Sequence, residues 1–121
     1  MLKDIKIRIE NSPGTLAGLG EALGKDGVNI EGFCGPCEGE GIAHILVNDK
    51  TSARNALEKA NIEVIDESDV LVLDVEDKPG ELGRFCRRIA DAGVNIDFFY
   101  VAANTRIVLG VDELETAKSA L

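Results

Sequence analysis

Short stretches of alternating hydrophobic and polar residues recur along the chain. Ile5, Ile7 and Ile9 alternate with polar residues, and Val70 and Val72 open a second stretch of the same kind. Because successive side chains of a strand point to opposite faces, this pattern predicts half-buried β-strands. We expect further strands near residues 28–33, 42–47, 62–65, 94–101 and 106–111.

Two segments instead show the three- and four-residue spacing of a helix. One carries Leu16, Leu19 and Leu23, and the other carries Leu82, Phe85 and Ile89. A Pro-Gly pair precedes each helix and breaks the strand before it, while Gly27 and Gly93 follow as expected left-handed caps. Two more helices are expected from about Thr51 and Glu113. The three glycines inside the first helix, Gly18, Gly20 and Gly24, are expected to permit close packing.

The second half of the chain repeats the first with an offset of 66 positions. Residues 9–16 align with residues 75–82, and residues 27–33 align with residues 93–99. Nine of the 25 positions from Ile9 to Phe33 recur identically, namely Glu10, Pro13, Gly14, Leu16, Gly27, Val28, Asn29, Ile30 and Phe33. This agreement without a gap indicates an internal duplication.

The order of elements is β-α-β-β-α-β in the first copy and the same without the last strand in the second, which predicts a ferredoxin-like α+β fold. We expect two βαββαβ modules side by side, at 1–67 and 68–121, each an antiparallel sheet with both helices on one face. The second copy ends within its second helix at Leu121, so its last strand is missing from the pattern. Its first strand is therefore expected to expose an edge that another segment or a second chain covers, which favours a homodimer.

Composition narrows the classes of function. The 121 residues are 45% hydrophobic and 29% charged, with a net charge of −9. This balance is typical of a folded protein, and the negative charge disfavours nucleic acids and anionic membranes as partners. The sequence has no stretch of about 18 apolar residues and no signal-peptide pattern near Met1, so a cytoplasmic location is expected.

The repeated motif resembles that of the ACT domain. Each copy shows a strand, then Asn/Asp-x-Pro-Gly-x-Leu, a helix, and Gly-Val-Asn-Ile opening the next strand. The resemblance covers nearly the whole chain. It implies modules that pair through their sheets and bind amino acids between the first loop of one module and a strand of its neighbour. It also implies an allosteric regulatory role rather than catalysis.

The residues at these places suit a free amino acid. A helix start offers N–H donors and a positive dipole end to a carboxylate, glycine lets the backbone approach closely, and Asn or Asp can accept from an ammonium. Each residue also has a purely structural reading, because Pro-Gly, Asn and Asp are common in turns. The expected ligand-binding residues of the first site are Asn11, Ser12, Pro13, Gly14, Thr15 and Leu16, with Asn95 and Ile96. Those of the second site are Asp77, Lys78, Pro79, Gly80, Glu81 and Leu82, with Asn29 and Ile30.

A Cys-Gly-Pro-Cys segment offers a different chemistry. Cys34 and Cys37 have the spacing of thioredoxin-type redox centres, but an acidic loop follows them instead of a helix, which disfavours a reactive thiolate. With His44, and with Glu38 or Glu40, they form a weak candidate for a zinc site. A loop with two small residues and a strand histidine is the favoured interpretation, and Cys86 is expected to pack within a helix.

Together these features predict a regulatory sensor of a free amino acid, without cofactor or catalytic activity, that signals to a partner enzyme or regulator in trans. The alternative is a ligand-free docking module that serves as a regulatory subunit of an amino-acid biosynthetic enzyme. A thiol or zinc protein is the third class. The sequence leaves open which amino acid binds and whether both sites are occupied.

Overall fold

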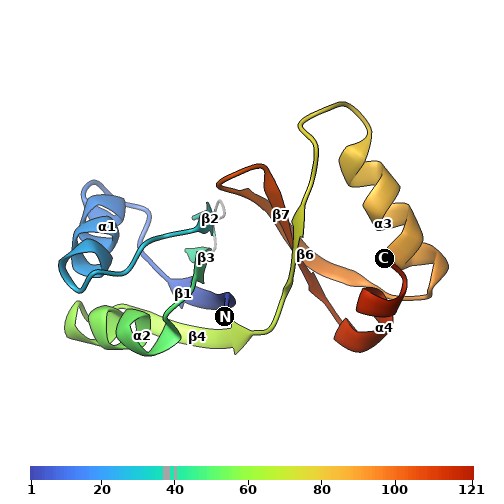
Figure 1. Cartoon of the computed structure of the whole chain (residues 1–121). Coiled ribbons are helices and arrows are strands. Elements are labelled where there is room, and N and C mark those ends of the chain that lie inside the picture. The colour runs from blue at the N-terminus through green and yellow to red at the C-terminus, as the bar shows by residue number, and fades with distance from the viewer. Residues whose placement is uncertain (37–38, 40) are drawn as a thin grey trace. The chain divides into compact units, whose positions relative to one another are not determined.

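The computed structural model describes residues 1–36, 39 and 41–121. This part of the chain divides into two compact units, Met1–Ser68 and Asp69–Leu121. Figure 1 shows that each unit combines strands with helices, in the order that the repeat predicts. None of the described helices is long and apolar enough to cross a membrane.

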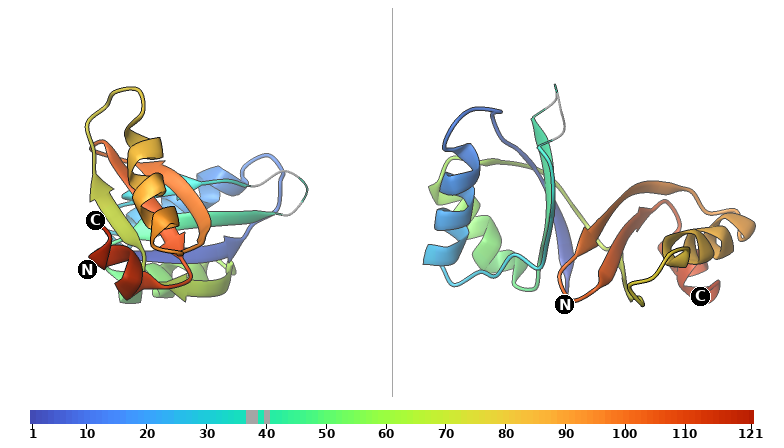
Figure 2. Two further views of the ribbon diagram at one scale, coloured as in Figure 1. Left: turned by 90° about the vertical axis from the view of Figure 1, so that its right-hand side faces the viewer. Right: turned by 90° about the horizontal axis from the view of Figure 1, so that it is seen from above.

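The first unit has the complete element order predicted for a copy. Its elements are β1 (Lys3–Arg8), α1 (Thr15–Lys25), β2 (Gly32–Cys34), β3 (Ile42–Val47), α2 (Lys50–Lys59) and β4 (Glu63–Ser68). The strands pair in the order β4-β1-β3-β2, and every neighbouring pair is antiparallel. Both helices lie on one side of this sheet, as the view from above in Figure 2 shows. This is the predicted ferredoxin-like arrangement.

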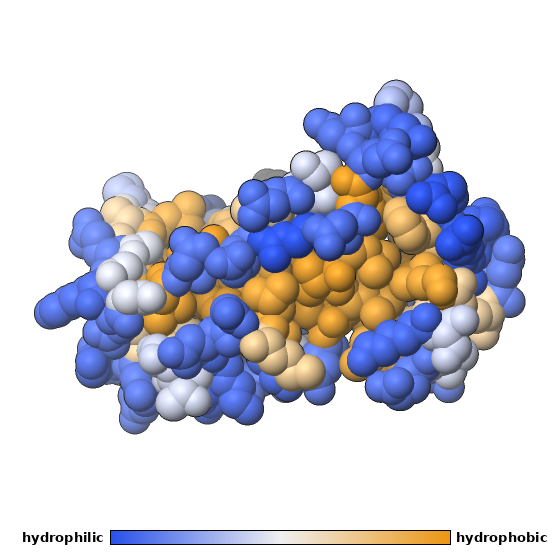
Figure 3. All heavy atoms as spheres, viewed as in Figure 1, coloured by the Kyte–Doolittle hydropathy of each residue, from blue (hydrophilic) through white to orange (hydrophobic). Residues whose placement is uncertain are grey.

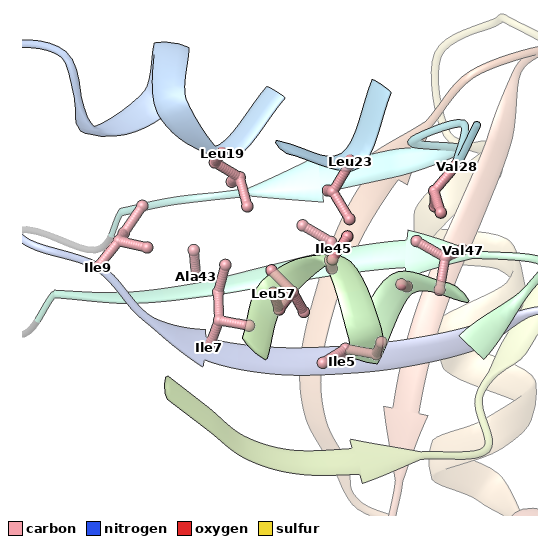
Figure 4. Packing of buried hydrophobic residues seen from close by; sticks show 12 residues of the cluster. Ile5, Ile7, Ile9, Leu19, Leu23, Val28, Ala43, Ile45, Val47 and Leu57 are labelled. Atoms are coloured by element: carbon pink, nitrogen blue, oxygen red, sulfur yellow. The ribbon is translucent and has the colours of Figure 1, made fainter. Parts of the chain in front are cut away.

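The core of the first unit lies between that sheet and its helices. Ile5 and Ile7 of β1 are fully buried, as the alternation predicts, and Ile45 is paired with Ile5 across the strands. Leu19 and Leu23 of α1 point from the helix toward the sheet in Figure 4. Burying a side chain of this size stabilises the fold by about 1.5–3 kcal/mol, so these few residues fix α1 on the sheet.

The second unit repeats most of this design. Its elements are β5 (Leu71–Asp74), α3 (Glu81–Asp91), β6 (Ile96–Ala102), β7 (Arg106–Val111) and α4 (Leu114–Ser119). Antiparallel pairs give the order β6-β7-β5, and α3 packs on a core that includes Ile89 and Leu109. Within the described residues this unit has no counterpart of β4, so β5 ends its strand order, as predicted.

The structure confirms the glycine caps and corrects two local predictions. Gly27 and Gly93 have φ of 72° and 79°, the left-handed conformation expected after a helix. The strand predicted from residue 28 starts only at Gly32, because the amide of Val28 still donates to Leu23 at the helix exit. The packing role predicted for Gly18, Gly20 and Gly24 is wrong, since a Cβ at each would meet no atom within 4 Å.

Candidate ligand-binding loops

The loop between β1 and α1 turns sharply at Gly14. This glycine caps the helix with φ 89° and ψ −12°, a backbone conformation that residues with a Cβ rarely adopt. A Cβ at this position would meet nothing within 4 Å, so the requirement for glycine is conformational rather than steric. The adjoining residues Asn11, Ser12 and Pro13 are exposed. The turn therefore presents the start of α1 to solvent.

Some backbone amides in the first turn of α1 have no hydrogen-bond acceptor among the described residues. Thr15 N donates to Ser12 O at 3.3 Å and Gly18 N donates to Gly14 O at 2.9 Å. No side chain caps the helix, and among the described residues the amides of Leu16 and Ala17 have no acceptor. Leu16 is 49% exposed. These amides, at the positive end of the helix dipole, suit a carboxylate.

Two hydroxyl groups stiffen this loop. Thr15 Oγ1 donates to the carbonyl oxygen of Ser12 at 2.6 Å, and the two side-chain oxygens of Ser12 and Thr15 lie 3.2 Å apart. A pocket of about 360 Å³ lies beside the loop, lined by Arg8, Ile9, Glu10, Asn11, Gly39 and Gly41. The carboxylate of Glu10 and the amide oxygen of Asn11 are acceptors of the kind that an ammonium needs. The loop thus offers hydrogen-bond donors to an anion and hydrogen-bond acceptors to a cation.

The corresponding loop between β5 and α3 has the same backbone and different chemistry. Gly80 caps α3 with φ 91° and ψ −10°. Glu81 follows it and is only 7% exposed, although residues 76–80 are all exposed. Arg84 holds the Glu81 carboxylate in a bidentate ion pair, with Nε–Oε1 and Nη2–Oε2 distances of 3.1 Å. This pair was not among the predicted site features, although its three-residue spacing on a helix could have suggested it.

The pKa of Glu81 reflects these contacts. The hydrogen bonds from Arg84 lower it most, and the charges of Arg84 and Lys78 and the backbone amide of Glu76 lower it further, against the opposing effect of burial. Lys78 Nζ lies 4.0 Å from Glu81 Oε1 and 3.1 Å from Glu76 Oε2. Figure 3 shows hydrophilic residues over this loop and the start of α3. The charged side chains of the second loop are therefore paired with one another.

The predicted residues at the strand entries have local partners in both copies. Asn29 donates its side-chain amide to Glu31, and Asn95 donates to Asp97 Oδ1 at 2.9 Å. Ile30 and Ile96 are partly buried and pack against the cores of their own units. The association of each loop with the strand entry of the other copy stays a prediction.

The metal and thiol candidates fall partly outside the described residues, because Cys37, Glu38 and Glu40 are not among them. Within the described part no group of three or more His, Cys, Asp or Glu side chains is placed to hold a metal ion. His44 lies opposite Cys34 in the β2–β3 pair, and its Nδ1 is 2.9 Å from Oδ2 of Asp4 on β1. Asp4 is 1% exposed, and its sequence position gave no sign of this partner.

Cys86 lies in α3 and packs against the second core, as predicted. Burial raises the pKa of its thiol, which makes the thiolate scarcer at neutral pH. The packing interpretation of this cysteine is therefore confirmed.

Proteins similar to this chain were found among solved structures. No protein-family model matches the sequence, and no curated protein is significantly similar to it. A solved structure of protein BT0572 from Bacteroides thetaiotaomicron is 26% identical, with a TM-score of 0.85, over 98% of this chain and 85% of that one.

Regulatory subunits of aspartate kinase show the same fold. The ligand-free subunit from Thermus thermophilus is 23% identical, with a TM-score of 0.72, over 99% of this chain and 87% of its own. The subunit from Thermus flavus is 20% identical, with a TM-score of 0.71, over 98% and 87%. The duplicated order of elements, the glycine-capped helices and these matches over nearly the whole chain agree. The chain therefore has the fold of tandem ACT-domain proteins.

Proposed function

We propose that this chain is a regulatory protein that senses a free amino acid and acts on a partner in trans. The observation that carries the proposal is the likeness over 98–99% of the chain to proteins described as regulatory subunits of aspartate kinase. The sequence repeat and the two glycine-capped helix starts support it independently.

The chemistry of the first loop supports an amino acid as ligand. The ligand carboxylate accepts hydrogen bonds from the amides of Leu16 and Ala17, and its ammonium donates to Glu10 or Asn11 beside the pocket. As the ACT resemblance implies, Asn95 and Ile96 belong to this proposed site, and Asn29 and Ile30 to the one around Asp77–Leu82. Binding then favours one conformation that the partner recognises.

The partner in this proposal is an enzyme of amino-acid biosynthesis. One structure of this fold, 18% identical to the chain with a TM-score of 0.71, is of aspartokinase alpha and beta subunits. A homodimer is part of the same proposal, because β5 ends its strand order and offers an edge for pairing. Light scattering at micromolar concentration tests the homodimer, and a strictly monomeric species contradicts it.

Thermal unfolding against each of the twenty free amino acids at 10 mM tests the sensor. A ligand that binds only the folded state stabilises it by RT ln(1 + [L]/Kd), which is about 2.7 kcal/mol at 100 times Kd. We expect one amino acid, or a few related ones, to raise the midpoint by several degrees, and their D-enantiomers to leave it unchanged.

A flat response to all twenty amino acids contradicts the sensor and favours the docking module, which acts through its surface alone. A rise that D- and L-forms share equally indicates a nonspecific solute effect and also contradicts the sensor. Metal content after purification in metal-free buffer tests the third class, because a zinc protein retains stoichiometric metal.

A further inference from the structure

The two copies differ at one position in a way that changes what their loops can bind. Thr15 and Glu81 occupy the same place, directly after the capping glycine. Thr15 is neutral, and its hydroxyl donates to the carbonyl oxygen of Ser12 within the loop. Glu81 places a buried carboxylate at the start of α3.

The surroundings of Glu81 show that this carboxylate is held by groups that would otherwise attract an anion. Arg84 binds both of its oxygens at 3.1 Å, and Lys78 approaches one of them to 4.0 Å. The positions equivalent to these two cations in the first copy are Ser12 and Gly18, which carry no charge. The second loop therefore has both the extra cations and the anion that neutralises them.

We infer that Glu81 is a built-in occupant that closes the second loop to amino acids, so that each chain binds a single ligand at the first loop. An incoming carboxylate at the start of α3 would face the fixed charge of Glu81 and would find Arg84 already engaged. Like charges at close range in a partly buried place repel strongly. Among the described residues the amides of Leu16 and Ala17 have no acceptor, and neither do the equivalent amides of Leu82 and Gly83, so the loops differ in the fixed anion, which the first helix turn lacks.

This inference rests on the proposed function and adds the number of sites and the residue that sets it. It also predicts how each loop could be converted into the other. Glu81→Thr gives the second loop the residue of the first, and Glu81→Gln removes only the charge while keeping the shape. Thr15→Glu installs the carboxylate in the first loop.

Isothermal titration calorimetry of the full chain tests it, with each of the twenty free L-amino acids as probe in turn. We expect one equivalent per chain for the wild type and two for Glu81→Thr and Glu81→Gln. Thr15→Glu is expected to weaken binding at least tenfold. Circular dichroism of each variant checks that it folds, and Glu81→Gln, which keeps the side-chain shape, provides the test if Glu81→Thr unfolds.

The outcomes separate this inference from the function on which it rests. Two equivalents per chain in the wild type, or one equivalent in both folded Glu81 variants, overturn the role of Glu81 and leave the sensor standing. No heat with any of the twenty amino acids, in the wild type or the variants, refutes the sensor itself and the inference with it.

Discussion

Replacing Gly14 by alanine should destabilise the first unit, although the new methyl group has open space around it. The reason is the backbone, because Gly14 is held at φ 89° where the chain turns from the loop into α1. An L-residue in a left-handed conformation costs about 1–2 kcal/mol. Alanine also stiffens the unfolded chain, which offsets about 0.4–1 kcal/mol of this. The free energy of unfolding of the Gly14→Ala protein is therefore expected to fall by about 1 kcal/mol.

Gly18→Ala provides the matched control within the same helix. Gly18 is helical and exposed, and a Cβ there also meets no atom within 4 Å. Alanine at such a position should stabilise the helix by about 0.5–1 kcal/mol, because glycine loses more backbone entropy on folding. The two substitutions add the same methyl group and should have opposite signs, with a difference of about 2 kcal/mol.

Thermal and denaturant unfolding measure this difference directly. In a domain of 60–100 residues, each 1 kcal/mol corresponds to roughly 4–8 °C in the midpoint, so the two variants should differ by about 8 °C or more. A Gly14→Ala protein as stable as the wild type would refute the conformational explanation of the Pro-Gly motif. A destabilised Gly18→Ala would show that α1 is packed more tightly than the structure has it.

Three further predictions follow from other parts of the chain. Because its contacts lower the pKa of Glu81, the folded state gains stability from the ionised carboxylate above the ordinary glutamate pKa of about 4.3 and loses it as pH falls through the lowered value. Glu81→Gln should therefore unfold at a lower temperature than the wild type at pH 7, and the gap should narrow as pH falls through the lowered pKa; a gap that is constant with pH contradicts this. Cys86 should react with iodoacetamide at pH 8 more slowly than glutathione does, as peptide mass spectrometry can follow, because burial raises the pKa of its thiol; equal rates would contradict it. Leu23→Ala should cost about 2–5 kcal/mol in urea unfolding, because Leu23 is fully buried; a loss below 1 kcal/mol would place Leu23 outside the core.

Much of the fold could be predicted because each local sequence pattern occurs in both copies of the duplication. The alternation at Ile5, Ile7 and Ile9 placed β1 correctly, and the recurring Gly-Val-Asn-Ile placed the two helix exits. The start of β2 could not be predicted in the same way. Val28 is apolar and follows a glycine, but its amide is engaged by the helix exit, which hydrophobicity alone does not reveal.

For the candidate site, only the backbone conformation at the glycine caps could be predicted from the sequence. The glycine caps follow from local sequence, whereas the buried state of Glu81 depends on Arg84 and on the shape of the loop around them. A charged residue directly after Pro-Gly ordinarily suggests an exposed helix start. The contact between Asp4 and His44 joins residues 40 positions apart, and only the register of β1 with β3 brings them together.

The most direct test of the central claim is to observe which backbone amides respond to an amino acid. Two-dimensional 1H–15N spectra of the uniformly 15N-labelled chain are recorded while the amino acid selected by thermal unfolding is added. We expect saturable shifts at Leu16, Ala17 and their neighbours in the first loop, and none at Leu82 and Gly83. Shifts centred on the second loop, or no saturable shifts at either helix start, would contradict the account.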